Sequence, residues 1–235
     1  MTLTLYQLQT TVDITAATRH VGHRRDTDLT IKTVLTETFG GAVLRPWSIA
    51  RRNGPILTIV GYSEQSAEEA NRRRELALPS LQATIGPVLG YKLPAPQAGD
   101  RLLFQVRLQP TVRCRDEHGN RREVDAFLHR VEAVGDDVPP REAVYIEYLG
   151  NRLEGARIEQ AHMERFQIAE RYRKSARSRV GFARYRAPDA VITGILEVTD
   201  ADALFQQIGT GIGRQRAFGC GMLRLAPVPV RAVAA

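Results

Sequence analysis

A segment rich in glycine and arginine near the C-terminus, residues 209–221, has the residue types needed to hold phosphate. It reads Gly-Thr-Gly-Ile-Gly-Arg-Gln-Arg-Ala-Phe-Gly-Cys-Gly and contains five glycines and two arginines. Glycine lets the backbone approach a ligand closely and adopt positive φ, and arginine supplies a rigid fork of donors that matches phosphate. Turns of this kind also direct backbone N–H groups at anions. Four residues are therefore candidate phosphate ligands: Gly211, Gly213, Arg214 and Arg216.

This segment does not match the glycine fingerprint of dinucleotide-binding proteins. That fingerprint, Gly-x-Gly-x-x-Gly, follows a strand and opens a helix. Here Arg216 stands at the third glycine position, and an apolar, strand-like run follows the segment. We therefore expect no nucleotide cofactor. A plain glycine-rich turn is the alternative interpretation, and the two arginines inside the turn argue against it.

A second cationic segment, residues 171–186, contains six arginines and one lysine and has no acidic residue. A solvated hairpin tip is one interpretation. Such a density of positive charge without acidic partners instead favours contact with a polyanion such as RNA, and the interleaved Tyr172, Phe182 and Tyr185 are suited to stacking. The residues expected to grip an RNA stem are Arg173, Lys174, Arg177, Arg179, Arg184 and Arg186.

The histidines are candidates for cleavage of RNA without a metal ion. That reaction needs a base for the 2′-hydroxyl, an acid for the 5′-oxygen and cations for the charged phosphorane. His20 and His23 stand out among the five histidines because they share a segment, expected to be a loop, with Arg24 and Arg25. A solvated basic loop is the alternative. No group of His, Cys, Asp and Glu has the spacing of metal ligands, and no Gly-x-Ser-x-Gly elbow is present.

Composition limits the classes of protein that the chain can represent. Its 235 residues are enough for one large or two small domains, and its net charge of +7 favours a polyanionic partner. No apolar stretch is long enough to span a bilayer, about 18 residues or more, and the N-terminus lacks the features of a signal peptide. Cys114 and Cys220 are far apart in the sequence. We therefore expect a cytoplasmic protein without a disulfide.

Apolar periodicity and turn signals predict a repeated order of elements. In the first half we expect a helix capped by Asp26 or Asp28 and ended by Gly40, a second helix at 64–78, and strands at 3–8, 43–50, 55–61 and 88–93. The Asn53–Gly54 pair predicts a hairpin turn between the strands at 43–50 and 55–61. In the second half we expect helices at 123–134 and from Pro140 to about 153, a short helix capped by Asp200, strands at 101–112, 157–171, 190–199 and 221–226, and a basic, charged turn at 113–122.

Each half thus has approximately the order strand, helix, strand, strand, helix, strand, which is typical of the ferredoxin-like fold. We therefore predict an α+β protein of two tandem ferredoxin-like domains. The predicted boundaries are 1–95 for the first domain and 99–235 for the second, which carries the basic hairpin and the glycine-rich loop. Residues 94–99, Pro-Ala-Pro-Gln-Ala-Gly, have the composition of a linker between them.

The C-terminal part closely resembles the CasE family of CRISPR repeat-processing endoribonucleases. The matching stretches are 193–200 and 211–227, and the similarity extends more loosely through 100–113, 122–128, 148–149 and 153–156. The resemblance implies two ferredoxin-like domains that recognise and cut a hairpin in precursor CRISPR RNA without a metal ion. It also implies that the mature RNA is kept within a multisubunit effector complex.

The chain departs from this family at one important position. The resemblance implies a catalytic histidine in the first helix, but Lys32 stands in its place, and Leu29 stands where a tyrosine often precedes it. A lysine with its ordinary pKa of about 10.4 is a poor base at neutral pH but a suitable cation or acid. Either His20 or His23 serves as the base, or lysine and arginine act electrostatically, or cleavage is slow or absent.

We interpret the sequence as an endoribonuclease that binds the repeat stem-loop of precursor CRISPR RNA, cuts it by 2′-hydroxyl attack, and remains on the 3′ hairpin of the product. The catalytic candidates are Lys32, His23 and His20, in falling order of positional support. One alternative is a non-catalytic subunit that binds the hairpin within an effector complex. A weaker alternative is a general RNA-binding protein unrelated to CRISPR.

Overall fold

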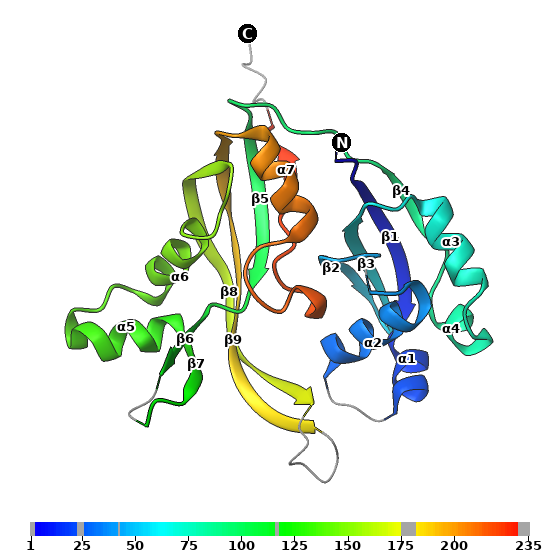
Figure 1. The fold of residues 1–235 in the computed structure, drawn as a ribbon, viewed down its shortest axis with the longest axis horizontal. Coiled ribbons are helices and arrows are strands. Elements are labelled where there is room, and N and C mark those ends of the chain that lie inside the picture. Colours follow the sequence, from blue (N-terminus) through cyan, green and yellow to red (C-terminus); the bar gives the residue numbers. More distant parts are fainter. Residues whose placement is uncertain (1–2, 23–25, 42, 116–117, 175–181, 230–235) are drawn as a thin grey trace.

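Each half of the chain forms a four-stranded antiparallel sheet that carries helices on one side (Figure 1). The computed structural model describes residues 3–22, 26–41, 43–115, 118–174 and 182–229, and it describes only the backbone at positions 136, 173, 174 and 182. None of the helices in these ranges has the length and apolar character needed to cross a bilayer.

The first half builds its sheet from residues 6–92. In chain order it contains β1 (Tyr6–Asp13), α1 (Ile14–Val21), α2 (Thr27–Phe39), β2 (Trp47–Asn53), β3 (Ile56–Ser63), α3 (Ala67–Glu75), α4 (Pro79–Thr84) and β4 (Leu89–Lys92). The strands lie side by side in the order β2-β3-β1-β4. The fourth strand therefore lies beside the first, as in the ferredoxin-like fold.

The second half repeats this arrangement and adds a hairpin. It contains β5 (Arg101–Leu108), β6 (Thr111–Arg115), β7 (Arg121–Asp125), α5 (Ala126–Val134), the 3₁₀ turn η1 (Gly135–Asp137), α6 (Arg141–Gly150), β8 (Ala156–Lys174), β9 (Phe182–Val198), α7 (Ala201–Thr210), the 3₁₀ turn η2 (Arg216–Phe218) and β10 (Arg224–Pro227). Its sheet has the order β10-β5-β9-β8, and β6 pairs only with β7. The prediction of two ferredoxin-like domains is confirmed, whereas the exact domain boundaries stay a prediction.

Side-chain caps begin five of the described helices: α1, α2, α3, α5 and α7. The Asp26 side chain accepts a hydrogen bond from the N–H of Leu29 at 3.1 Å and starts α2, and Asp200 in the same way accepts from Ala203 at 3.0 Å and starts α7. Both caps were predicted from the sequence. Asp13 also caps a helix, accepting from the N–H of Thr15 at 2.8 Å. That helix, α1, includes His20, so the expectation of a loop beginning at residue 18 was wrong.

Two other predicted elements differ from the structure for local reasons. The helix predicted at 64–78 ends at Glu75, because Pro79 begins the separate helix α4 and proline favours the first helical position. The segment 113–122, predicted as a turn, and the start of the helix predicted at 123 instead form the β6–β7 hairpin. The helix α5 starts only after Asp125, whose side chain accepts from the N–H of Phe127 at 2.8 Å.

The two halves are packed against each other through apolar side chains. The first half has its own core between the sheet and the helices α1, α2 and α3. The larger core of the second half, built on β5, β9, α6 and α7, also takes in Leu5, Val60 and Tyr62 from the first half. The Tyr62 hydroxyl donates to the carbonyl of Leu223 at 2.9 Å. Burial and hydrogen bonding together therefore fix β3 against the C-terminal segment.

A buried network of charges also joins the two halves. Arg107 on β5 donates to both oxygens of Asp28 on α2, at 3.2 and 2.9 Å, and to both oxygens of Asp189 on β9, at 2.8 and 2.6 Å. Arg171 on β8 bonds to the same two aspartates, at 3.0 Å in the case of Asp189. We call Asp28, Arg107, Arg171 and Asp189 the interdomain charge network.

The network lowers the pKa of Asp189. Burial alone would raise the pKa of Asp189, but the hydrogen bonds and charge of Arg107, with the charge of Arg171, outweigh this and hold that pKa below its usual range. A buried carboxylate whose folded-state pKa is depressed stabilises the fold when it is ionised. This contribution is fully present above the unfolded pKa, about 3.9, and is lost as the pH falls below that value.

We expect the substitution Asp189→Asn to lower the free energy of unfolding by about 3 to 5 kcal/mol at neutral pH, because Arg107 and Arg171 would then share the single carboxylate of Asp28 in a buried site. Urea unfolding from about pH 6 to about pH 3 should also show a weaker acid dependence than in the wild type. Asp202→Asn, at an exposed carboxylate on α7, is the control. A stability and a pH profile of Asp189→Asn that match those of the control would contradict a central role for the network.

Candidate nucleic-acid interface

The glycine-rich segment forms a compact loop between α7 and β10, as predicted, and it is anchored to both halves. The indole N–H of Trp47, a buried residue at the start of β2, donates to the carbonyl of Ala217 at 3.0 Å. The N–H of Gly221 donates to the carbonyl of Arg107 on β5 at 2.7 Å. The loop is therefore held at the junction between the two sheets, directly beside the interdomain charge network.

Two of its glycines are required by close packing. A Cβ atom on Gly219 would lie 2.7 Å from the Trp47 ring, and one on Gly221 would lie 2.2 Å from the carbonyl oxygen of Ile212. Both also have positive φ, +74° and +77°, which side chains disfavour. Gly211 is buried too, against Pro46, and its N–H closes the end of α7 on the carbonyl of Gln207. This buried position gives Gly211 a packing role.

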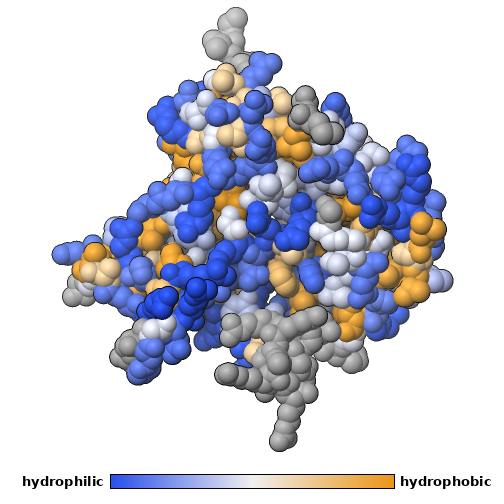
Figure 2. Space-filling view, viewed as in Figure 1, coloured by the Kyte–Doolittle hydropathy of each residue, from blue (hydrophilic) through white to orange (hydrophobic). Residues whose placement is uncertain are grey.

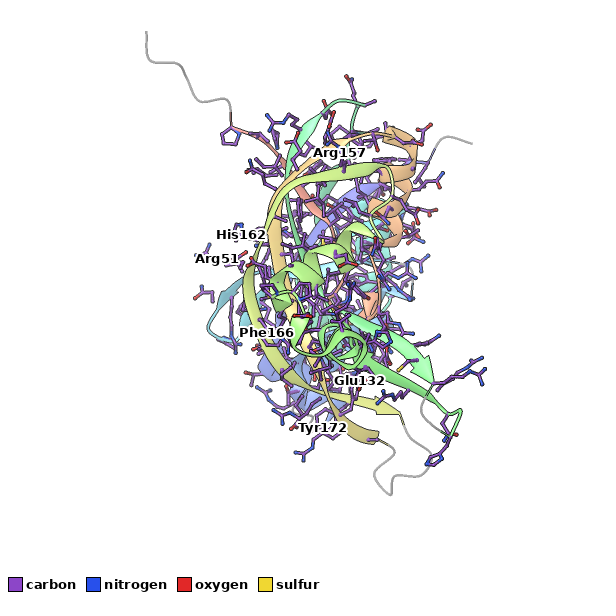
Figure 3. The ribbon with its side chains drawn as sticks, turned by 90° about the vertical axis from the view of Figure 1, so that its left-hand side faces the viewer. Arg51, Glu132, Arg157, His162, Phe166 and Tyr172 are labelled. Atoms are coloured by element: carbon purple, nitrogen blue, oxygen red, sulfur yellow. The ribbon has the colours of Figure 1, made fainter. Side chains whose placement is uncertain are left out.

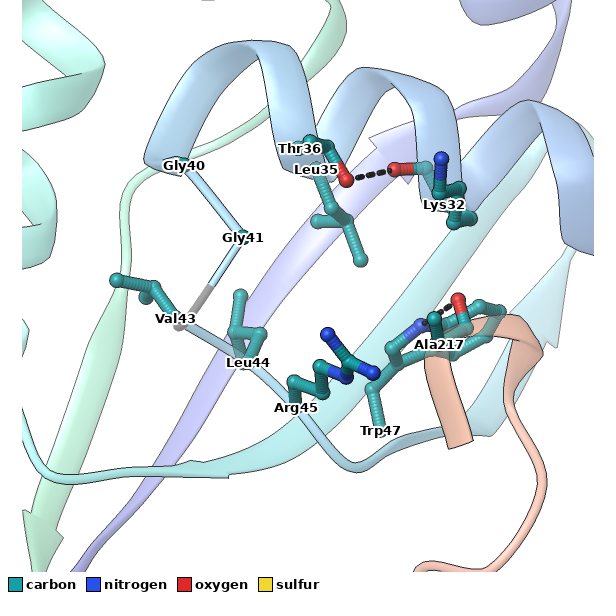
Figure 4. Close-up of a pocket in the computed structure, with 10 residues that line it drawn as sticks. All are labelled: Lys32, Leu35, Thr36, Gly40, Gly41, Val43, Leu44, Arg45, Trp47 and Ala217. Carbon is teal, nitrogen blue, oxygen red and sulfur yellow. Dashed lines mark hydrogen bonds between the residues drawn. The ribbon is translucent and has the colours of Figure 1, made fainter. Parts of the chain in front are cut away.

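A hollow of about 220 Å³ lies where the loop meets the first half. Lys32 on α2 lies on one wall, and Arg45 and Ala217 lie on the opposite wall (Figure 4). We call it the lysine hollow. No carboxylate in the described part of the chain forms an ion pair with Lys32 or Arg45. Its lining residues are Lys32, Leu35, Thr36, Gly40, Gly41, Val43, Leu44, Arg45, Trp47 and Ala217.

A second hollow of about 390 Å³ adjoins the first on the other side of the loop and shares Arg45 and Ala217 with it. We call it the arginine hollow. Its other lining residues are Arg113, Glu123, Gly213, Arg214, Gln215, Arg216 and Phe218. Four guanidinium groups thus share this hollow with one carboxylate, and the carboxylate, Glu123, is paired with Arg214. Such an excess of positive charge favours the entry of an anion.

The arginines of this hollow affect one another. Burial first, and then the positive charge of Arg113, hold the pKa of Arg214 below its ordinary value. Arg216 donates to the carbonyl of Thr210 at 2.8 Å, which fixes part of its side chain against the end of α7. Gln215, in the left-handed region at φ +59°, donates to the hydroxyl of Tyr185 on β9 at 3.2 Å. The loop is thereby tied to β9 close to the turn end of the β8–β9 hairpin.

The structure brings Lys32 to the glycine-rich loop but keeps His20 away from it. Both ring nitrogens of His20 have partners: Nε2 lies 2.8 Å from Glu37 Oε2, and Nδ1 lies 3.2 Å from Ser80 Oγ. Successive helical residues rotate by about 100°, so Glu37, five positions after Lys32, lies roughly 140° around α2 from it. Of the two residues, only Lys32 lines the lysine hollow.

The remaining predicted residues fall into three groups. Arg184 and Arg186 are exposed on β9, where Arg184 pairs with Glu170 at 3.1 Å. Arg173 and Lys174 belong to β8, but only their backbone is described. Five candidates lie outside the described residues: His23, Arg24, Arg25, Arg177 and Arg179.

Arg45 and Arg113 are basic residues of the interface that the sequence did not single out. Arg45 lies 169 positions before Arg214 in the sequence and enters the site only because Trp47, two residues later, docks on the loop. Arg113 was part of a segment expected to be a turn. Its strand pairing, opposite Glu123, places it in the arginine hollow. The alternation of charged and apolar residues at 111–115 is the signal that would have indicated this strand.

The fold and this interface define a tandem ferredoxin-like protein with a cationic face built around a glycine-rich loop. A family model described as CRISPR associated protein matches residues 10–227, and the chain belongs to this family. No match is found among curated proteins.

Solved structures with the same fold include CRISPR endoribonucleases. Cse3 bound to a 19-nucleotide RNA is 18% identical, with a TM-score of 0.62 over 94% of this chain and 100% of its own. Cas6e from Escherichia coli K-12 is 22% identical, with a TM-score of 0.61 over 95% and 100%. Thermus thermophilus Cse3, bound to an RNA representing a pre-cleavage complex, is 18% identical, with a TM-score of 0.59 over 95% and 100%. The resemblance to the CasE family is confirmed.

We expect Gly219→Ala to disrupt the loop, because the added methyl group collides with the Trp47 ring. This collision should lower the free energy of unfolding by about 1 to 3 kcal/mol more than the positive φ does alone. Gly54→Ala is the matched control, since Gly54 also has positive φ but has open space around it. Urea unfolding measures the difference, and Trp47, the single tryptophan of the chain, should shift its fluorescence only in Gly219→Ala. Equal stability and equal emission of the two variants would contradict the packing role of Gly219.

Proposed function

We propose that this protein is an endoribonuclease that binds the repeat stem-loop of precursor CRISPR RNA and cleaves it without a metal ion. The observation that carries the proposal is the juxtaposition of Lys32, Arg45 and the glycine-rich loop in two adjoining hollows. Membership of the CRISPR associated family supports an RNA substrate. Proteins of the same fold are endoribonucleases with bound RNA.

In the proposed reaction the 2′-oxygen attacks the adjacent phosphorus and its proton passes to a base. The bond from phosphorus to the 5′-oxygen breaks, and that oxygen takes up a proton. The products carry a 2′,3′-cyclic phosphate and a 5′-hydroxyl. Lys32 is assigned as the cation and proton donor on the leaving side, because a lysine ammonium is protonated at neutral pH. Arg45 and Arg216 would stabilise the charge on the phosphorane.

We assign the role of base to His23. The other candidate base, His20, is hydrogen-bonded to Glu37 and Ser80. The β8–β9 hairpin would bind the phosphates of the RNA stem through six basic residues. Arg184 and Arg186 are described members of this set, and Arg173, Lys174, Arg177 and Arg179 complete it. Arg24, Arg25, Gly213 and Arg214 would contact the backbone near the cut.

A second candidate function is a subunit that binds the hairpin of the mature RNA without cutting it. One observation favours this candidate: none of the described residues that line the lysine hollow is a histidine. A CRISPR RNA-guided surveillance complex includes a chain of the same fold, with a TM-score of 0.54 and 16% identity. We propose that other effector subunits are partners in either case.

We expect the purified protein to cut its cognate repeat RNA in EDTA, and a single 2′-deoxy substitution at the cut site should abolish the reaction. Lys32→Ala should lower the single-turnover rate about 100-fold, the lower range for loss of a proton donor or an electrostatic contact, and should leave Kd nearly unchanged. Lys92→Ala, at an exposed lysine on β4, is the control.

Each outcome separates the alternatives. Tight binding of an RNA that stays intact would support the non-catalytic subunit. Cutting of the deoxy substrate would exclude attack by the 2′-hydroxyl. A wild-type rate in Lys32→Ala would remove Lys32 from the mechanism. Equal affinity for unrelated hairpins would indicate a general RNA-binding protein.

A further inference from the structure

The β6–β7 hairpin has one face that is rich in arginines without an ion pair to a described residue. In its antiparallel register Arg113 lies opposite Glu123, and Arg115 lies opposite Arg121. Directly opposed residues, and residues two apart on one strand, point to the same face of a sheet. Arg113, Arg115 and Arg121 therefore share one face, and Arg122 lies on the other.

The two faces differ in how their arginines are balanced. On the other face, Arg122 forms an ion pair of 2.7 Å with Glu132 on α5. On the arginine-rich face, the one described carboxylate near the base of the hairpin, Glu123, is paired with Arg214. Neither Arg113 nor Arg121 forms an ion pair with any described residue. Arg115 reaches only the carbonyl of Gly119, at 3.5 Å.

A directly opposed pair of like charges, such as Arg115 and Arg121, destabilises a hairpin. A bound polyanion would remove this repulsion. The arginine-rich face is also continuous with the candidate interface, because Arg113 and Glu123 at its base line the arginine hollow. The charged face thus leads from the glycine-rich loop toward the tip of the hairpin.

The hairpin also has a suitable position in the molecule. Figures 1 and 3, two views at right angles, show β6–β7 and β8–β9 projecting from the same end of the molecule. Both extend toward the same side in Figure 3, whereas they diverge from each other in Figure 1. Figure 2 shows strongly hydrophilic side chains gathered over β6 and β7. The exposed residues there include Arg113, Arg115, Arg121 and Arg122. For a nucleic acid bound by β8–β9, the β6–β7 hairpin would therefore provide a second cationic surface at the same end of the protein.

We propose that Arg113, Arg115 and Arg121 form a phosphate-binding track for the backbone of the repeat RNA where it leaves the arginine hollow. The proposal rests on the RNA-binding function proposed above and adds a second gripping element to β8–β9. The track binds phosphates, so it contributes affinity and orientation but little sequence preference.

The test compares two double variants that remove the same charge. Arg115→Ala with Arg121→Ala removes the opposed pair of the track. Arg122→Ala with Arg130→Ala removes two neighbouring arginines that are bound in ion pairs, to Glu132 and Glu147. Kd for the repeat RNA is measured at several salt concentrations. The track variant should bind about tenfold more weakly and lose about 1.5 from the salt slope, since each phosphate contact contributes about 0.7 to 0.9. The control should bind within about twofold of the wild type, since its arginines make no phosphate contact.

The outcomes are separable from those of the proposed function. If the wild type does not bind repeat RNA, the proposed function fails. If the wild type binds and the track variant binds equally well, only the track is overturned. Equal losses in both double variants would indicate a general effect of net charge and would also overturn it. The track variant should lose the same factor in affinity for a repeat RNA whose stem base pairs are permuted. A loss of affinity for only one of the two stem sequences would contradict a contact with the phosphate backbone.

Discussion

The pairing of Arg107 with Asp28 and Asp189 is the constraint on which the rest of the structure depends. Asp28 lies in the first turn of α2, so the pair fixes the helix that carries Lys32 one turn later. The carbonyl of Arg107 holds the N–H of Gly221, so the same residue fixes the end of the glycine-rich loop. Buried ion pairs add little net stability compared with apolar packing, but their loss is costly and their geometry is restrictive. Here the restriction places α2 and the loop beside each other.

Apolar packing completes this arrangement at the other edge of the loop. Trp47 is buried beneath Gly219 and holds Ala217 with its indole N–H. Arg45, two residues earlier, is thereby placed between the lysine hollow and the arginine hollow. The loop therefore serves as the joint through which basic residues of both halves meet. Its glycines are needed for packing at least as much as for access to a ligand.

The arginines of this chain have two distinct roles that depend on their surroundings. Arg107 and Arg171 are enclosed by aspartates and hold the two halves together. Arg45, Arg113 and Arg121 have no described acidic partner and lie at or beside the two hollows. Part of the net charge of +7 therefore lies unbalanced beside the glycine-rich loop and on the β6–β7 hairpin. This distribution is the property that makes RNA a suitable ligand.

The sequence by itself determined the local features. Hydrophobic alternation, the caps Asp26 and Asp200 and the Asn53–Gly54 turn predicted most elements and the ferredoxin-like order, because these signals act within a few residues. It also identified the glycine-rich loop and the Lys32 position. Tertiary structure alone decided that His20 binds Glu37 on another side of α2, that residues 121–125 pair with β6, and that Arg45 and Arg113 reach the loop. These facts depend on contacts between residues far apart in the chain, which periodicity and capping do not encode.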